Sequence, residues 1–464
     1  MKVSTDFGER KVDIEVPDSA TVVEFADPPL LSDPQAAVRK ALAEPLGLPP
    51  LAEQAKPGMR VAIGFDDITR PGMPPKLVLP RIVEELERAG VDHRDIVFIN
   101  ACSNHRKNTR SELASHLGPE IFNRFNPLGA IRNHDCDDPA GLRAFGHTAS
   151  GRYVEHNRDF IDADLQVYQG NVSAQAWKGY TGTGAIIGLA STRSIASHHS
   201  FSTVPDPRKK MEHQKAAGAK LPGMKPEMTA VLEEATGKKI FYVNAVTGMG
   251  GRPAAFFAGH AGAVTAPAWE LAGRCFTKEV PQADVLVVGL GAAYSYGSSE
   301  NALIAAVGAL VPPRYSPDLP VLREGGVVIA LSPSSGWIDP DRYPSYQRLI
   351  DLYDRHHDIR ALADHEETFH GDPDLMQKYR HGFGYPALHA FWIFYEFEYA
   401  LRRAGAVIMA GTRNPGAFRR LGLQTAPDFD AAWKAARRYV GDNPATVVAP
   451  TFWSRPRIKF SVKA

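Results

Sequence analysis

Short runs of apolar residues alternate with amphipathic stretches along most of the chain. The run at residues 60–65 (RVAIGF) precedes a helical pattern at residues 77–89, and the run at residues 96–101 (IVFINA) precedes one at residues 111–117. Uninterrupted apolar runs of this length are typical of parallel strands covered by helices on both faces. Similar runs occur at residues 165–170, 239–246, 284–291, 326–331, 406–410 and 446–448. The pattern predicts an α/β protein with mostly parallel sheets.

The apolar runs fall into two groups, which predicts two lobes. Pro267, Pro281 and a helix-like stretch separate the groups near residues 265–283. We therefore expect an N-terminal α/β lobe at residues 1–270 and a C-terminal α/β lobe at residues 271–464. The active-site cleft is expected between them, because ligand sites are common at such interfaces.

Two segments depart from this alternation. Near the N-terminus, residues 11–16 (KVDIEV) and 21–26 (TVVEFA) alternate in polarity, which predicts an opening hairpin followed by a helix at residues 34–44. Residues 200–225 are rich in Pro, Lys and Gly, which predicts a mobile surface excursion.

Composition and charge narrow the class of protein. The 464 residues are 44% apolar and 23% charged, as in ordinary globular proteins. Lys and Arg number 53 against 52 Asp and Glu, and no basic run offers the phosphate contacts of a nucleic-acid partner. No apolar leader or membrane-length apolar run occurs, and the three cysteines fit neither a disulfide framework nor a CxxC site. We expect a cytoplasmic protein without a membrane partner.

Three places carry candidate chemistry, and the first is the strand end at residues 64–71 (GFDDITRP). Asp67 and Arg70 follow the buried strand there, where α/β proteins bind ligands. An arginine can bind a phosphate or carboxylate, and an aspartate can accept from ribose hydroxyls. A capped turn with a local Asp–Arg ion pair is the structural alternative.

His105 follows the next strand, in the sequence CSNHRKNT, and a histidine there can act as an acid or base near neutral pH. An incidental loop histidine is the alternative. The stretch at residues 132–139 (RNHDCDDP) combines His, Cys and Asp, but adjacent residues rarely wrap one metal ion. A turn that supports His105 is the preferred interpretation.

The third place is the glycine-rich stretch at residues 179–191 (GYTGTGAIIGLAS). The backbone of Gly182, Thr183 and Gly184 is expected to approach a phosphate, although the Lys-Ser/Thr pair of a Walker loop is absent. His198 and His199 follow, and such a pair could bind a metal through an imidazole nitrogen. An inert, exposed His-His pair is the alternative.

Together these motifs resemble the nickel-dependent lactate racemase family of 2-hydroxyacid racemases and epimerases. The matching text is EPLGLPPLAEQAKPGMRVAIGFDDITRP, NACSNHRKNTRSEL, NHDCDDP and GYTGTG with the later GLAS and HH. The resemblance implies a two-lobed α/β enzyme with a nickel-pincer nucleotide, a pyridinium mononucleotide that holds nickel through sulfur and carbon. In that family the cofactor takes hydride from the α-carbon and returns it to either face, while a histidine deprotonates the hydroxyl.

The resemblance also implies roles for individual residues. Asp67 and Arg70 fall on the family's cofactor and active-site Asp-x-x-Arg positions, and His105 falls on one catalytic histidine. His199 falls on the nickel-ligating histidine, with His198 one step away.

The chain departs from the family at several positions. Gln175 stands at the second catalytic histidine, and Ala185 stands at the lysine that tethers the cofactor. We therefore expect noncovalent binding, with Lys178 as either a phosphate contact or a solvated side chain. Ser298 and Asn301 fall loosely on a Gln-x-x-Lys substrate pair, which would suit a more hydroxylated, sugar-acid substrate.

These observations favour a racemase or epimerase of a 2-hydroxyacid, with cofactor-biosynthesis proteins as candidate partners. Two alternatives stay open. One is a hydroxyacid dehydrogenation without racemisation, if only one face of the substrate meets a base. The other is a noncatalytic relative that binds the nucleotide or nickel cofactor.

Overall fold

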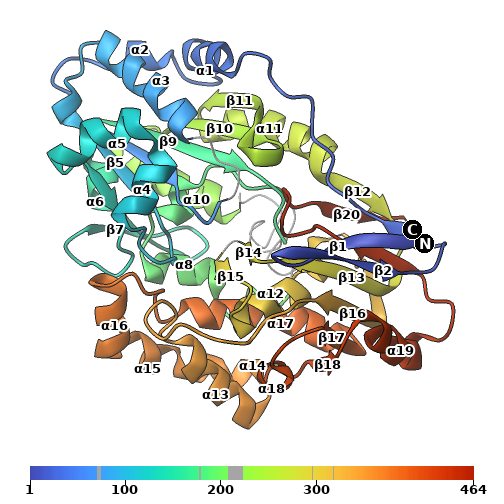
Figure 1. Cartoon of the computed structure of the whole chain (residues 1–464). Coiled ribbons are helices and arrows are strands. Elements are labelled where there is room, and N and C mark those ends of the chain that lie inside the picture. Colours follow the sequence, from blue (N-terminus) through green and yellow to red (C-terminus); the bar gives the residue numbers. More distant parts are fainter. Residues whose placement is uncertain (71–74, 177–178, 207–222, 295, 317, 464) are drawn as a thin grey trace.

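Two large sheets, each mostly parallel and each packed against helices, organise the chain (Figure 1). The computed structural model describes residues 1–70, 75–176, 179–206, 223–294, 296–316 and 318–463. The predicted α/β class is confirmed.

The first sheet has six strands in the order β11-β10-β9-β4-β5-β6. Its neighbours are parallel except for β11, which pairs antiparallel with β10. Every residue of β4 is buried, as expected for a central strand covered on both faces. The strands are β4 (Val61–Asp66), β5 (Ile96–Ala101), β6 (Ile131–Asn133), β9 (Leu165–Val172), β10 (Phe241–Thr247) and β11 (Pro253–Gly259).

The second sheet has eight strands and draws on both ends of the chain. β13 pairs in parallel with β16, β19 and β1, and β17 and β18 extend the sheet beyond β16. The strands are β1 (Lys2–Gly8), β2 (Arg10–Glu15), β3 (Thr21–Val22), β13 (Ala283–Gly291), β16 (Leu322–Leu331), β17 (Ala406–Ala410), β18 (Gln424–Ala426) and β19 (Thr446–Ala449).

The opening hairpin differs from its prediction. It forms between β1 and β2, with Lys2 opposite Glu15, and not between residues 11–16 and 21–26. Gly8 adopts a φ of 62°, which allows the tight reversal there. β3 instead pairs in parallel with β19. Residues 2–22 thus lie in the second sheet, and the division at residue 270 stays a prediction.

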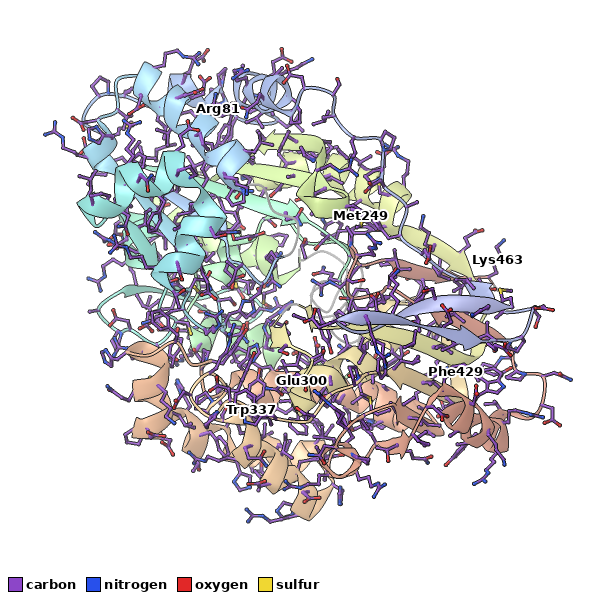
Figure 2. All side chains as sticks on the ribbon, viewed as in Figure 1. Arg81, Met249, Glu300, Trp337, Phe429 and Lys463 are labelled. Carbon is purple, nitrogen blue, oxygen red and sulfur yellow. The ribbon has the colours of Figure 1, made fainter. Side chains whose placement is uncertain are left out.

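Helices cover both sheets, and apolar side chains fill the layers between them. Figure 2 draws the described side chains on the ribbon. Those near the first sheet are α1 (Pro34–Ala43), α3 (Pro75–Arg88), α4 (Arg110–Leu117), α5 (Pro119–Phe125), α10 (Met224–Thr236) and α11 (Ala261–Phe276). Those near the second are α12 (Ala302–Leu310), α13 (Tyr346–His356), α16 (Pro373–Arg380), α17 (His389–Arg403) and α19 (Phe429–Val440). The helices predicted at residues 34–44, 77–89 and 111–117 are confirmed as α1, α3 and α4.

The remaining elements are short. They are α2 (Leu51–Gln54), β7 (Leu142–His147), β8 (Tyr153–Asn157), α6 (Arg158–Asp162), α7 (Ala185–Gly188), α8 (Thr192–His199), β12 (Thr277–Val280), β14 (Ala293–Tyr294), β15 (Gly297–Ser298), α14 (Ile359–Leu362), α15 (Glu366–His370), α18 (Pro415–Arg419) and β20 (Lys459–Val462). Most of the excursion predicted at residues 200–225 lies outside the described residues. None of the helices in the described part of the chain combines the length and apolarity needed to cross a bilayer.

The stretch at residues 132–139 ties the two halves together. The Asp135 carboxylate lies 2.8 Å from Nζ of Lys107 and 3.2 Å from Nε of Arg380 in α16. Asp138 pairs with the same arginine at 2.8 Å. These acids bridge the halves instead of gathering around a metal.

Candidate active site

The candidate site forms where the carboxyl ends of three neighbouring strands meet. β9, β4 and β5 are adjacent and parallel, so the loops that follow them lie at one edge of the sheet. A cavity of about 900 Å³ opens at this edge. Its lining includes Arg70, His105, Gln175, residues 182–184, His198 and His199. Most of the sequence-predicted site residues therefore share one cavity.

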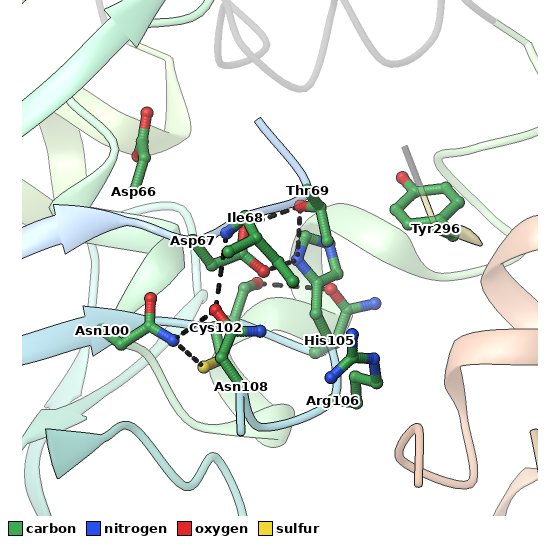
Figure 3. A network of polar contacts seen from close by, with 12 residues as sticks. Asp66, Asp67, Ile68, Thr69, Asn100, Cys102, His105, Arg106, Asn108 and Tyr296 are labelled. Carbon is green, nitrogen blue, oxygen red and sulfur yellow. Dashed lines mark hydrogen bonds and ion pairs between the residues drawn. The ribbon is translucent and has the colours of Figure 1, made fainter. Parts of the chain in front are cut away.

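Asp67 binds the side chain of His105 (Figure 3). Nδ1 of His105 lies 3.0 Å from Oδ2 of Asp67, and the Thr69 hydroxyl donates to Oδ1 of Asp67 at 2.6 Å. Both carboxylate oxygens are thus engaged, and Asp67 is only 1% exposed. The structure places Asp67 behind His105, so its predicted contact with a ribose stays untested.

Electrostatics keep Asp67 ionised. Burial acts to raise the pKa of the Asp67 carboxyl, but the charge of His105, its hydrogen bond and the charge of Arg70 outweigh burial and lower the pKa. An ionised Asp67 accepts a hydrogen bond from Nδ1–H of His105, so Nε2 of the neutral ring is available as a base.

The loop that carries His105 is held rigidly. Ser103 has a φ of 54°, and the backbone N–H of His105 donates to the carbonyl of Cys102 at 2.7 Å. Arg106 points away and binds Glu112, which also caps α4. Ser103 is one of three non-glycine residues with positive φ among the described residues, and it lines the cavity. Such conformations cluster at functional sites.

Asp66 and Arg70 provide opposite charges at the cavity wall. Burial raises the pKa of Asp66, although Arg70 lies nearby and the hydroxyl of Tyr168 donates to Oδ1 at 2.6 Å. Burial opposes the charge of Arg70, yet Asp67 and other neighbours hold its pKa above the ordinary value. Arg70 therefore stays a cation in the cavity, suited to a phosphate or a carboxylate.

The glycine loop lies close against this acid. A Cβ atom at Gly184 would come within 2.6 Å of the Tyr168 hydroxyl and 2.8 Å of Oδ1 of Asp66. Gly182 has a φ of 106°, and Thr183 has a φ of 49°. The chain can follow this path only with little or no side chain at Gly184.

Lys225 is a cavity residue that sequence reasoning missed. It lies in the first turn of α10, and its Nζ donates to the carbonyl of Gly182 at 2.9 Å. Burial lowers its pKa to about 8, with Arg70 adding to the effect and Asp66 opposing it. No sequence signal pointed to Lys225, because it falls in the Lys-rich stretch interpreted as a surface excursion.

His198 and His199 end α8 and both line the cavity. Their Nδ1 atoms lie 3.2 Å apart, and the ring of His199 lies 5.1 Å from that of Trp392. Within the described residues no group of three or more His, Cys, Asp or Glu side chains could hold a metal by itself. A metal here would need ligands other than these side chains as well as an imidazole.

The remaining residues predicted for the site are Gln175, Lys178, Ser298 and Asn301. The Gln175 amide lines the cavity and donates to the carbonyl of Tyr180 at 3.1 Å. Lys178 lies outside the described residues. The Asn301 oxygen caps α12 through two backbone N–H groups, and the described lining contains neither Asn301 nor Ser298. The sugar-acid substrate therefore stays a prediction.

The second half of the chain completes the cavity wall. His389 at the start of α17 and Tyr296 both line it, and their ring centroids lie 4.8 Å apart. His389 follows no recognisable motif, because it opens a run of apolar residues typical of a buried helix.

The N-terminal part of the chain is similar in sequence to known proteins. Residues 7–212 match the family model of the lactate racemase N-terminal domain. The lactate racemase of Lactiplantibacillus plantarum is 27% identical over 176 residues, which are 38% of this chain and 40% of that protein. The lactate racemase of Thermoanaerobacterium thermosaccharolyticum is 26% identical over 172 residues, 37% of this chain and 39% of that protein. The matched segment thus spans about two fifths of each relative.

Solved structures extend the likeness to the whole fold. The lactate racemase apoprotein from Thermoanaerobacterium thermosaccharolyticum superposes with a TM-score of 0.74 at 19% identity, over 99% of this chain and 100% of that one. A protein from Thermotoga maritima has a TM-score of 0.56 at 16% identity, over 95% of this chain and 100% of that one.

Proposed function

We propose that this chain, whose residues 7–212 match the lactate racemase N-terminal domain, racemises or epimerises a 2-hydroxyacid at C2 with a noncovalently bound nickel-pincer nucleotide. The observation that carries this proposal is the pairing of His105 with Asp67 beside a cavity that Arg70 also lines. A base and a cation are the two groups that the hydroxyl and the carboxylate of a 2-hydroxyacid require.

The residues present fit such a cofactor. A cavity of about 900 Å³ lies in the size range of nucleotide and ligand pockets. Arg70 and Lys225 offer positive charge for a phosphate, and the approach of the loop at Gly184 to Asp66 leaves no room for a side chain there. His199, with His198 beside it, offers an imidazole for nickel.

Ala185 supports noncovalent retention. It is fully buried and has no amine, so the cofactor would depend on contacts with charged and backbone groups. Lys225 reaches the same loop from α10. Among the described residues, it is the lysine that lines the cavity. We assign Lys225 the role of an additional cation for the cofactor's anionic groups.

In this proposal each protein group has one task. The bound cofactor would supply the acceptor for the hydrogen and electron pair leaving C2. Asp67 holds Nδ1 of His105, so Nε2 accepts the substrate's hydroxyl proton and later returns it. Arg70 holds the carboxylate of the substrate or the phosphate of the cofactor. Orientation by these fixed groups lowers the entropy cost of reaction.

Chiral chromatography tests the proposal directly. Protein produced together with the cofactor pathway is incubated with single enantiomers of lactate, 2-hydroxybutyrate and gluconate, each deuterated at C2. We expect one acid to be converted to its C2 stereoisomer with the deuterium retained, because hydrogen that moves as hydride does not exchange with water. The absence of inversion for all acids tested, with loaded cofactor, would contradict the proposal.

A second candidate function is dehydrogenation without racemisation, and Gln175 favours it. Its amide is directed to the Tyr180 carbonyl and cannot act as a base. In that case the same incubation would yield the 2-oxo acid in proportion to enzyme, with no inverted product. Measuring both products therefore separates the two functions. The 2-oxo acid without inverted product indicates dehydrogenation, and the C2 stereoisomer indicates racemisation.

A further inference from the structure

A second histidine, His389, lies beside His105 in the cavity wall although it comes from the other half of the chain. Their ring centroids are 5.8 Å apart, with the ring planes at 83°. His389 is 2% exposed, and it lines the same cavity. A substrate oxygen at Nε2 of His105 would therefore have a second imidazole close by.

The hydrogen bonds of the two histidines assign them opposite tautomers. The Asp67 carboxylate can only accept, so His105 carries its proton on Nδ1 and has a lone pair on Nε2. Nδ1 of His389 lies 2.7 Å from the hydroxyl of Tyr346.

The Tyr346 hydroxyl donates to His389. Burial raises the pKa of Tyr346 well above its usual range, so the hydroxyl keeps its proton. Within the described residues, this hydroxyl has one hydrogen-bond partner, Nδ1 of His389. A buried hydroxyl that did not donate would lose its hydrogen bond with water without replacement. Nδ1 of His389 therefore accepts, and the neutral ring carries its proton on Nε2.

The surroundings also keep His389 neutral. Burial lowers its pKa well below the usual value, and the charges of His105 and His199 add to the effect. Aromatic rings fix its position: Tyr385 lies 4.4 Å away and Tyr346 stacks at 8°. The titratable groups that face it from neighbouring elements are His105, His199, Tyr296, Tyr346 and Tyr385.

We propose that Nε2–H of His389 is a catalytic hydrogen-bond donor to the C2 oxygen of the substrate, opposite the base His105. The inference rests on the proposed function and assigns a role within it. Within the described residues, both rings form their hydrogen bonds through Nδ1 and not through Nε2, and both line the cavity. The two rings thus offer one acceptor and one donor to the same oxygen.

The proton balance follows from the two tautomers. Nε2 of His105 takes the hydroxyl proton, and the O–H electron pair forms the carbonyl bond. The hydrogen on C2 would leave with its electron pair to the acceptor that the cofactor of the proposed function would supply. His389 donates a hydrogen bond to the oxygen throughout and keeps its own proton. Its stabilisation is greatest where the oxygen is most negative, which lowers the barrier in both directions.

Nitrogen NMR of the protein without cofactor tests the tautomers independently of activity. Protein labelled with ¹⁵N-histidine is compared with His389→Phe and His105→Gln variants to assign the signals. We expect His389 to carry its proton on Nε2 from about pH 6 to about pH 9, because its ring stays neutral. The Tyr346→Phe variant removes the donor and should move part of that proton to Nδ1. A parent His389 protonated on Nδ1 would overturn the proposal.

Turnover of the loaded protein tests the catalytic role. We expect His389→Phe to lower kcat about 10²- to 10³-fold, the usual loss for one donor to a developing oxyanion. His389→Gln keeps an N–H donor and should recover most of that loss. The pH dependence of kcat should keep its shape in His389→Gln, because a neutral donor contributes no titration. His381→Phe, an exposed histidine of the same half, serves as the control.

Binding of oxamate, an isostere of a 2-oxo acid, covers the case in which the parent turns over no acid. We expect oxamate to shift the Nε2–H signal of His389 and His389→Phe to bind it about 10-fold more weakly, as loss of one such hydrogen bond implies. A His389→Phe protein with parental kcat, or with parental oxamate affinity, contradicts the role. An inactive parent that still binds oxamate through His389 contradicts only the proposed reaction.

Discussion

Oδ2 of Asp67 lies 3.0 Å from Nδ1 of His105, and the two side chains are 1% and 4% exposed. Such a pair fixes both the orientation and the tautomer of the imidazole. The adjacent acid, Asp66, points away from this pair and accepts a hydrogen bond from the hydroxyl of Tyr168.

Replacing Asp67 should disable His105 while leaving its ring in place. In Asp67→Asn the amide can donate to Nδ1, which would place the histidine proton on Nε2 and block the base. We expect turnover to fall about 10²- to 10⁴-fold, the range of acid–base contributions. The turnover of His105→Ala should fall by a similar factor. Asp13→Asn, at an exposed position of the opening hairpin, should keep parental turnover; equal turnover in Asp67→Asn would contradict the assignment.

The same residue predicts a pH-dependent stability. The pKa of Asp67 is lower in the folded protein than the unfolded value of about 3.9. Its contribution is therefore present above that unfolded value and is lost as the pH falls through the folded pKa. Urea unfolding should show parent more stable than Asp67→Asn at neutral pH, with the difference shrinking below about pH 4. A stability difference between parent and Asp67→Asn that grows on acidification would contradict the lowered pKa of Asp67.

The close approach at Gly184 predicts a steric effect. Alanine there would bring a Cβ atom within 2.6 Å of the Tyr168 hydroxyl, so the loop must move. We expect Gly184→Ala to lose about 1 to 3 kcal/mol of stability and to release the cofactor during dialysis. Gly416→Ala has only ordinary contacts at its Cβ position and should change neither property.

Noncovalent retention predicts that the cofactor can be removed intact. Mass spectrometry of denatured holoprotein should give the unmodified polypeptide mass, because Ala185 has no amine. Arg70→Ala should weaken retention roughly 10- to 150-fold, as loss of one charged hydrogen bond of about 1.5 to 3 kcal/mol implies. A covalent adduct, at Lys178 or Lys225 in particular, would show that another lysine supplies the tether.

Lys225 should titrate unusually early. With its pKa lowered to about 8, it should react with an amine-directed reagent at a lower pH than exposed lysines. The folded state favours the neutral amine, so stability relative to Lys225→Met should rise between about pH 8 and the unfolded value of about 10.4. Peptide mapping after labelling locates the reaction; half-modification of Lys225 near pH 10 would contradict the lowered pKa.

Nickel content distinguishes the two adjacent histidines. His199 is the expected ligand and His198 the alternative, because both line the cavity after the glycine loop. Elemental analysis of His199→Ala, His198→Ala and the double variant should show nickel lost only with the true ligand. Stoichiometric nickel in the double variant would exclude both.

The amino-acid sequence by itself determined the strands and the residues that follow them. Apolar runs identified β4, β5, β9 and β13, since a strand buried on both faces needs such runs. Polar motifs after β4 and β5 located Asp67, Arg70 and His105, because parallel strands bring their carboxyl ends to one edge. The structure keeps these predicted elements because they depend only on residues that are close together in the sequence.

Only the tertiary structure decided how distant residues combine. The hairpin lies in the second sheet because β1 pairs in parallel with β13. Lys225 and His389 entered the cavity because the packing of α10 and α17 directs them there, and neither position carries a motif. The tautomer of His389 depends on a hydroxyl from α13. Such contacts form between segments that are remote along the chain, so no local pattern of hydrophobic and polar residues encodes them.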